Sequence, residues 1–373
     1  MRVLVLAPPL SGNGGIQRYT NTLTQALRDL LGDESVRCLA ISDLPGGNGK
    51  GRFSALAKLK FAGRALREAV RWRPDLTICT HLALGSLGWS AAKLGHRPYW
   101  IVLHGIEAWV KLPRWKQRAL DRASRVIVTS AFSREQVIKR HKIDEQRISR
   151  LPCTLDETLL NTRAVEAGAC ARIPPGQRVI LTVARMASVE RYKGHEEVLR
   201  ALPSVVEKIP NLTYAIVGGG DDRPRLEGLA QELGLAKHVV FTGEVSDSEL
   251  AALYHRSEVF LLPARTVISD HDSKGEGFGI VYLEAMAYGK PVIGPNYGAP
   301  AEIIQNGQNG LLVDPEDPSA IAKALLNLLN EPDLAREMGR EGSEWVKRTY
   351  SYDSFRVQLR EILATGTISV PQS

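Results

Sequence analysis

The chain has few cysteines and no long apolar run. Its four cysteines, Cys38, Cys79, Cys153 and Cys170, form no CxxC pair and have no histidine at metal-ligand spacing. This excludes a disulfide scaffold and predicts scattered reduced thiols, as expected of a cytoplasmic protein. No stretch reaches the roughly 18 uncharged apolar residues of a membrane-spanning helix, so we expect neither a spanning segment nor secretion.

Disorder and low complexity are also excluded. Of the 373 residues, 44% are hydrophobic and 24% are charged, which is ordinary for a soluble globular protein and unlike a disordered or collagen-like chain. Because a domain holds roughly 150 residues, this length predicts two domains.

Acidic residues are scarce in the first half. Residues 1–172 carry 28 Lys and Arg against 14 Asp and Glu, a net charge of +14, whereas residues 173–373 have a net charge of −7. A basic half suggests an anionic partner such as a phospholipid surface or a diphosphate substrate. The cations are densest over residues 50–73, where the pattern fits a patch facing a membrane or a lipid diphosphate, and equally fits a solvated helix.

Short apolar runs alternate with helical patterns along both halves. In the first half the runs cover residues 3–7, 76–80, 100–103 and 125–129, and the alternation restarts at residue 179 after a segment, 152–177, that holds prolines and glycines. This predicts an α/β fold of two Rossmann-like domains, residues 1–167 and 174–351, joined by a linker. In such folds the ligand lies at the carboxyl ends of the strands, here in an interdomain cleft.

Two glycine-rich turns follow predicted strands. Gly14 and Gly15 follow the first strand, and Gly218 to Gly220 follow a strand of the second domain. Glycines let main-chain N–H groups approach a phosphate at the start of a helix, although a tight turn without a ligand has the same signature.

Charged residues accompany these turns in the second domain. Arg185 and Lys193 flank a loop and could neutralise a diphosphate. Glu276 and Glu284 are eight residues apart, with a predicted helix beginning after Gly279. Carboxylates accept hydrogen bonds from vicinal hydroxyls, and a helix start favours an anion, so this segment suits a sugar nucleotide.

An ordered set of motifs resembles family four of the nucleotide-sugar glycosyltransferases over nearly the whole chain. The motifs are Gly14-Gly15, His104-Gly105, Arg185 with Lys193-Gly194, Val217-Gly218-Gly219-Gly220, Phe241-Thr242-Gly243, Glu276-Gly277-Phe278-Gly279 through Glu284, and Gly310-Leu311-Leu312-Val313. The resemblance implies the GT-B fold and retaining transfer of a sugar from a nucleotide-diphosphate donor, with neither metal nor cofactor.

The resemblance also implies roles for single residues. Arg185 and Lys193 would bind the diphosphate, and Glu276 with the Phe278-Gly279 main chain would hold the donor sugar. Glu284 would bind the ribose, and His104 would lie beside the reacting sugar. The remaining donor-binding residues would be Gly14, Gly15, Gly218, Gly219, Phe241, Thr242, Gly243, Gly277 and Ile280. A last helix, about residues 352–364, would cross back to the first domain.

The donor and acceptor are less closely defined. Similarity to bacterial mannosyltransferases favours GDP-mannose over a UDP-hexose, and the basic half favours a glycan or polyprenyl-diphosphate-linked glycan at the inner face of the membrane, with no nucleic-acid partner. One departure from the family is the hinge, which reads Pro152-Cys153-Thr154-Leu155-Asp156. Two other functions stay open: a nucleotide-sugar epimerase, and a non-catalytic module that binds anionic surfaces.

Some residue patterns carry no functional expectation. Asp270-His271-Asp272 resembles an Asp-x-Asp metal motif, but we expect no metal there because Arg185 and Lys193 supply the positive charge. His81 and His195 are expected to pack in the fold or lie at its surface.

Overall fold

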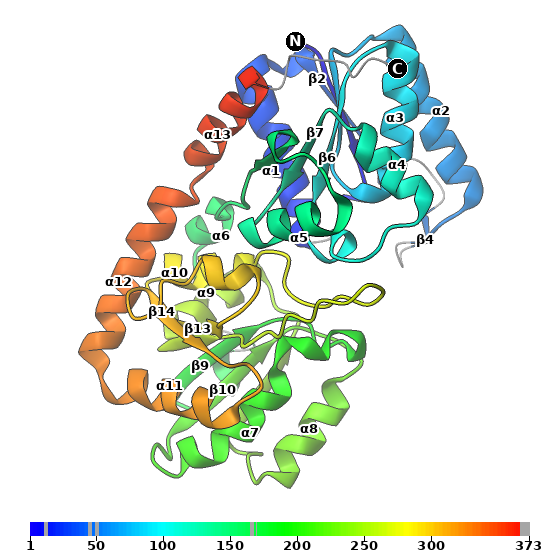
Figure 1. Cartoon of the computed structure of the whole chain (residues 1–373). Coiled ribbons are helices and arrows are strands. Elements are labelled where there is room, and N and C mark those ends of the chain that lie inside the picture. The colour runs from blue at the N-terminus through cyan, green and yellow to red at the C-terminus, as the bar shows by residue number, and fades with distance from the viewer. Residues whose placement is uncertain (11–13, 44–46, 49–51, 165–167, 169, 366–373) are drawn as a thin grey trace. The chain divides into compact units, whose positions relative to one another are not determined.

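The computed structural model describes residues 1–10, 14–43, 47–48, 52–164, 168 and 170–365. These residues form two compact units (Figure 1). The first comprises the described residues of Met1–Thr154, Ser269–Asp272 and Tyr352–Ser373, and the second comprises those of Leu155–Ile268 and Ser273–Ser351. The chain therefore leaves the first unit at the start of the expected linker.

The first unit is built on a parallel sheet of six strands in the order β2-β1-β5-β6-β7-β8. The strands are β1 (Val3–Ala7), β2 (Val36–Ala40), β5 (Leu76–Cys79), β6 (Tyr99–Leu103), β7 (Arg125–Val128) and β8 (Ile148–Arg150), with a separate short pair, β3 (Gly47–Asn48) and β4 (Arg52–Phe53). Every residue of β1, β5 and β6 is buried, because helices cover both faces of such a sheet.

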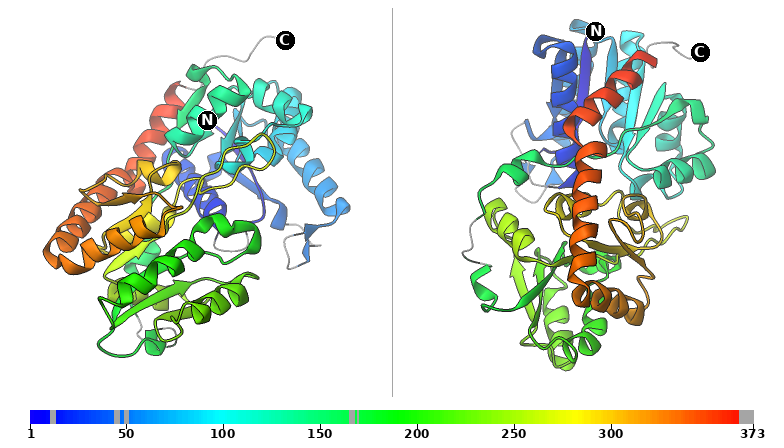
Figure 2. Two further views of the ribbon diagram at one scale, coloured as in Figure 1. Left: turned by 60° about the horizontal axis from the view of Figure 1, so that its bottom comes forward. Right: turned by 90° about the vertical axis from the view of Figure 1, so that its left-hand side faces the viewer.

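The helices of this unit follow the strands in alternation. They are α1 (Gly15–Leu31), α2 (Ala55–Arg71), α3 (Gly85–Gly95), α4 (Arg114–Arg122), α5 (Ala131–His141) and α13 (Tyr352–Thr365). The last of them, α13, packs on α1: the Tyr352 hydroxyl donates to Asp29 Oδ2 at 2.7 Å, and the rings of Phe355 and Tyr19 meet edge to face at 5.8 Å. The C-terminal helix therefore belongs to the unit that contains the N-terminus (Figure 2).

The second unit repeats the architecture with the strand order β11-β10-β9-β12-β13-β14, again parallel. Its strands are β9 (Arg178–Val183), β10 (Leu212–Val217), β11 (Val239–Gly243), β12 (Val259–Leu261), β13 (Val292–Pro295) and β14 (Gly310–Val313). Its helices are α6 (Glu157–Asn161), α7 (His195–Val206), α8 (Arg223–Glu232), α9 (Asp247–Arg256), α10 (Ile280–Ala287), α11 (Pro318–Asn330) and α12 (Pro332–Thr349).

The segment around α6 is placed differently from the sequence-based division at residue 167. It packs in the second unit, where the Tyr288 hydroxyl donates to the Leu159 carbonyl at 3.0 Å. The predicted α/β architecture of two Rossmann-like sheets is confirmed, while the interdomain cleft stays a prediction. None of the helices in the described ranges is long and apolar enough to cross a membrane.

Candidate functional site

The candidate donor site occupies the carboxyl ends of the second unit's strands. The loop after β9 carries Arg185 and Lys193, the loop after β10 carries the glycines from Gly218, and the segment before α10 carries Glu276. Because parallel strands all end at the same edge of a sheet, these three segments converge.

Lys193 and Glu276 form the ion pair at the centre of this site. Lys193 Nζ lies 2.5 Å from Glu276 Oε1, and the two side chains are only 13% and 16% exposed. Gly194, which follows, has φ of +83°, and a Cβ there would overlap the Pro263 carbonyl oxygen. Only glycine fits this position easily, so the turn that presents Lys193 depends on it.

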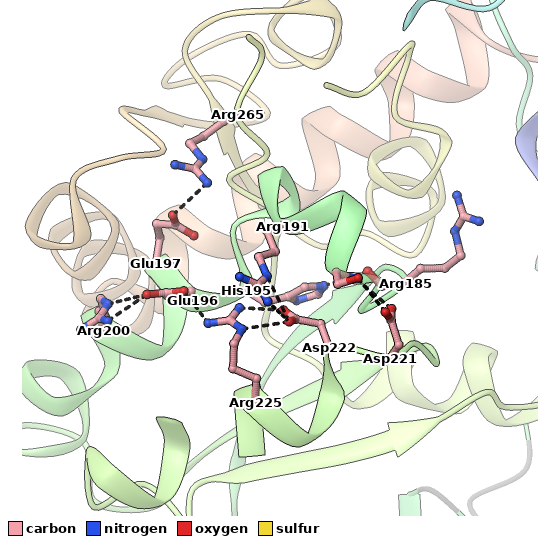
Figure 3. A network of polar contacts seen from close by, with 11 residues as sticks. Arg185, Arg191, His195, Glu196, Glu197, Arg200, Asp221, Asp222, Arg225 and Arg265 are labelled. Carbon is pink, nitrogen blue, oxygen red and sulfur yellow. Dashed lines mark hydrogen bonds and ion pairs between the residues drawn. The ribbon is translucent and has the colours of Figure 1, made fainter. Parts of the chain in front are cut away.

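The loop that carries Lys193 is tied to the start of α8 by further charge pairs (Figure 3). Arg191 Nη2 and Arg225 Nη2 each contact the Asp222 carboxylate, at 2.8 and 2.6 Å, and the Ser188 hydroxyl donates to Asp221 Oδ2 at 2.6 Å. Hydrogen bonding from Arg225 is the main cause that lowers the pKa of Asp222. The Arg191–Asp222 and Ser188–Asp221 contacts therefore join this loop to the start of α8.

Arg185, the second predicted cation, lies on the same loop but points elsewhere. Its guanidinium pairs with Glu190 at 2.5 Å, and its side chain is 73% exposed. In Figure 3 it extends away from the cluster around Asp222. Because the Arg185 side chain is mostly exposed, its guanidinium has room to turn toward an anion.

The glycines after β10 let two loops approach closely. Gly218 has φ of +132°, and a Cβ there would overlap the Ala184 carbonyl oxygen. Its N–H donates to the Gly243 carbonyl at 2.9 Å, and Gly219 accepts from the Met186 N–H at 2.8 Å. The Gly218 N–H is thus engaged within the fold, and this glycine serves the packing of β10 against its neighbours.

Phe241 and Thr242 lie in the edge strand β11. The Thr242 hydroxyl donates to the Ile216 carbonyl at 3.2 Å, and Arg172 donates to the carbonyls of Phe241 and Thr242 at 3.3 and 2.8 Å. Arg172 has no sequence signature, since nothing local links it to a strand about 70 residues later.

The start of α10 has the geometry expected of the Glu-x7-Glu segment. Gly279 has φ of +105° and precedes Ile280, the first residue of the helix, and Gly277 lies just before the buried Phe278. The ring of Phe278 packs against Tyr350 at 5.8 Å. The main chain at this helix start is therefore fixed by packing on one side.

Glu284 lies deeper than a surface ligand-binding carboxylate. It is 1% exposed, and the Tyr254 hydroxyl donates to its Oε2 at 2.9 Å. Tyr254 in turn stacks on Tyr288 at 5.1 Å. The sequence did not reveal these aromatic neighbours, because they come from α9 and the end of α10.

The predicted residues of the first unit also lie at strand ends. His104 follows β6; its Nε2 lies 2.7 Å from the Thr80 carbonyl oxygen, and its main-chain N–H donates to Glu107 Oε1 at 2.5 Å. Its ring stacks on His81 at 6.2 Å and meets Tyr19 edge to face at 5.3 Å. Because the Thr80 carbonyl can only accept, Nε2 of His104 carries the proton.

His81 is a neighbour of His104, although the sequence predicted only that it packs in the fold or lies at its surface. Its Nδ1 accepts from the Ala83 N–H at 3.0 Å, and burial is the main cause that lowers its pKa. The sequence signal for such a neighbour was a histidine just after a predicted parallel strand. Gly14 and Gly15 lie at the start of α1, and the preceding residues 11–13 of that predicted turn lie outside the described residues.

No cluster of three or more His, Cys, Asp or Glu side chains suited to a metal ion occurs within the part of the chain that the structure describes. Asp270 of the Asp-x-Asp motif instead pairs with Arg140, whose Nη1 lies 2.6 Å from Asp270 Oδ1.

Comparison with known proteins identifies the family. The family described as Glycosyltransferase Family 4 matches residues 13–159, and the one described as Glycosyl transferases group 1 matches residues 169–345. A GDP-mannose-dependent alpha-(1-6)-phosphatidylinositol monomannoside mannosyltransferase from Mycobacterium tuberculosis is 38% identical over 182 residues, which are 49% of this chain and 47% of that protein.

A D-inositol 3-phosphate glycosyltransferase from Corynebacterium urealyticum is 30% identical over 258 residues, 66% of this chain and 58% of that protein. The chain thus spans about half the length of the curated relatives it matches. The crystal structure of HepE from Anabaena in complex with UDP and glucose superposes with a TM-score of 0.77 at 19% identity, covering 98% of this chain and 100% of that one, which shows a shared fold.

One family match covers most of the first unit and the other covers most of the second, and both sheets have the GT-B architecture. The chain therefore belongs to glycosyltransferase family 4.

Proposed function

We propose that the protein transfers a hexose, with mannose as the first choice, from a nucleotide-diphosphate sugar to a hydroxyl of a glycan or lipid-linked glycan, with retention at the anomeric carbon. The observation that carries the proposal is the Lys193–Glu276 pair, largely removed from solvent at the strand ends and next to the helix that Gly279 begins. A cation for a diphosphate and a carboxylate for sugar hydroxyls are what a sugar nucleotide requires.

The chemistry assigned to these residues is electrostatic. Breaking the bond at the anomeric carbon develops negative charge on the leaving diphosphate. Lys193 and Arg185 would stabilise that charge, with the main-chain amides at the start of α10 adding to it. The acceptor hydroxyl would attack from the face that the diphosphate leaves, and a diphosphate oxygen would take its proton. Two cations then stand where a divalent metal would otherwise be needed.

GDP-mannose is the preferred donor. The support comes from the mycobacterial relatives named as GDP-mannose-dependent mannosyltransferases, at 38% identity. A UDP-hexose is the second choice. The inositol phosphate and phosphatidylinositol in the relatives' names further favour an acceptor that carries a phosphate group.

The surface of α2 supports an acceptor held at an anionic membrane. Its inner face buries Ala57, Phe61, Ala65 and Ala69, and its outer face exposes Leu56, Leu59 and Val70. Exposed cations stand on the same helix: Lys58, Lys60, Arg64, Arg67 and Arg71. Apolar side chains among cations are typical of a helix that lies in the headgroup region of a bilayer. Lys50, from the same basic stretch, lies outside the described residues.

A donor panel followed by variant kinetics tests the proposal. GDP-mannose should raise the melting temperature more than UDP-glucose or ADP-glucose, because a ligand that binds the native state stabilises it. Glu276→Gln should lower kcat, since Glu276 would act at the reacting sugar, whereas Glu284→Gln should mainly raise the KM for the donor.

Glu232→Gln is the matched control, because this glutamate is exposed at the end of α8 and lies outside the site. No stabilisation by any sugar nucleotide would refute the proposal. A product in which the donor sugar is inverted at a ring carbon, without transfer, would favour the epimerase. Identical kinetics for the two glutamate variants would refute their separate roles.

A further inference from the structure

A basic pocket lies in the first unit, away from the residues assigned above. It has a volume of about 710 Å³ and lies between α4, α5 and the segment that leads into α4. Its lining includes five cations, Lys111, Arg114, Arg118, Lys139 and Arg140, and a single carboxylate, that of Asp270. Five positive charges against one negative charge make it strongly anion-attracting.

Most of this positive charge is not neutralised by the protein. Within the described ranges, the side chains of Lys111, Arg114 and Arg118 make no ion pair, whereas Lys139 pairs with Glu135 along α5 at 2.5 Å. Like charges gathered around one hollow repel each other and lower stability unless an anion joins them. The arrangement is therefore better explained by a ligand than by folding.

Arg140 shows where an oxyanion would lie. Its Nη1 contacts Asp270 Oδ1 at 2.6 Å, while its Nε is buried and has no hydrogen-bond partner among the described residues. The Arg140 side chain is 20% exposed, but the Asp270 carboxylate is 68% exposed, so water screens this pair and it is easily exchanged. A guanidinium paired with a mostly exposed carboxylate can exchange that partner for a group with several oxygens, which phosphate provides.

We propose that this pocket, bounded by Lys111, Arg114 and Arg140, binds the phosphate group of the sugar acceptor. That the phosphate belongs to a sugar acceptor rests on the proposed function. The binding of a phosphate in this pocket does not depend on sugar transfer. The chemistry recognised is a phosphate ester, which could belong to a soluble phosphorylated sugar alcohol or to a phospholipid headgroup. Asp270 occupies part of the site until the phosphate displaces it.

Direct binding tests the pocket without catalysis. The protein would be titrated with glycerol 3-phosphate, with glycerol as the uncharged control, and with dihexanoyl phosphatidylinositol, which stays monomeric at low concentration. Lys111→Gln/Arg114→Gln should raise the Kd of whichever phosphate ester binds by about tenfold or more, as expected when contacts to a charged group are lost. Binding of the first ester alone indicates a soluble acceptor, and binding of the second indicates a lipid headgroup.

Two further variants make the result decisive. Lys93→Gln/Arg97→Gln removes one lysine and one arginine from exposed positions of the same unit, outside the pocket, and should leave the Kd unchanged. Asp270→Asn should lower the Kd severalfold, because it removes the competing carboxylate. The proposal is overturned if neither ester binds, if the pocket and control variants behave alike, or if Asp270→Asn weakens binding. Phosphate binding without sugar transfer to any acceptor would refute the proposed function but would still support a phosphate site in this pocket.

Discussion

Burial controls the protonation of His195, which begins α7 directly after Lys193-Gly194. Its Nε2 lies 3.2 Å from the Arg185 carbonyl oxygen, and its Nδ1 is buried without a partner among the described residues. Removal from water lowers the pKa of His195 to about 4, and the carbonyl of Arg185 opposes that shift only in part. The group therefore couples pH to the stability of the donor-site loop.

The sign and size of the effect follow from linkage. In the unfolded chain His195 takes up a proton below its ordinary pKa of about 6.5, whereas in the native state it does so only at about pH 4. The free energy of unfolding therefore falls as the pH falls through this window. At pH 5 the loss relative to pH 7.5 should be about 2 kcal/mol. The pKa of Asp222 is lowered by Arg225, so its own contribution is lost only at lower pH.

The measurement is urea unfolding at pH 7.5 and pH 5.0 at constant ionic strength, for the wild type and for His195→Gln. The wild type should lose about 2 kcal/mol more than the variant over this interval, because groups common to both proteins cancel in the difference. An NMR titration of the His195 ring should give a midpoint far below 6.5. Equal losses for both proteins, or a ring that titrates near 6.5, would refute the reasoning.

Three other predictions concern the site and the surface. Lys193→Gln and Glu276→Gln should each lower the free energy of unfolding. The double variant should lose about 1 to 2 kcal/mol less than the sum of the two single losses, because the second substitution removes a charge whose partner is already gone. Strict additivity of the losses in urea unfolding would show that the two side chains do not stabilise each other. Transfer activity should survive EDTA, and rescue of a chelated enzyme by Mn²⁺ would instead give Asp270 and Asp272 a metal role. Replacing the α2 cations with glutamine should weaken binding to anionic liposomes at low salt by about 1 kcal/mol of binding free energy per cation, while donor binding persists. Unchanged co-sedimentation with the liposomes would show that this face of α2 is merely solvated. The residues to change are Lys58, Lys60, Arg64 and Arg67.

In the first unit the central strands could be predicted closely, and the edge strands could not. The run at residues 3–7 became β1, and that at 100–103 became all but the first residue of β6. The predicted alternation of strands and helices omitted β2 and β8, both of which lie at the edges of this sheet. An edge strand pairs on one side only and needs fewer apolar residues: in β2, Arg37 is exposed and Cys38 half-buried. Its pattern therefore gives a weaker signal.

The predicted site residues were recognisable as motifs, but their contacts were not. The spacing of Glu276 and Glu284 predicted one carboxylate in a loop and one within a helix, and that helix does begin directly after Gly279. That Lys193 lies 2.5 Å from Glu276, or that Tyr254 covers Glu284, follows from no local pattern.

Sequence patterns alone predict the periodicity of the elements, the glycine turns and the identity of the family, because these depend on residues near one another in the chain or on the order of motifs. No sequence pattern predicts that His104 stacks on His81, that α6 packs in the second unit, or that cations of α4 and α5 share a pocket with Asp270. Contacts of this kind join residues from different strands and helices, and the sheet order that brings them together is set by packing of the whole core.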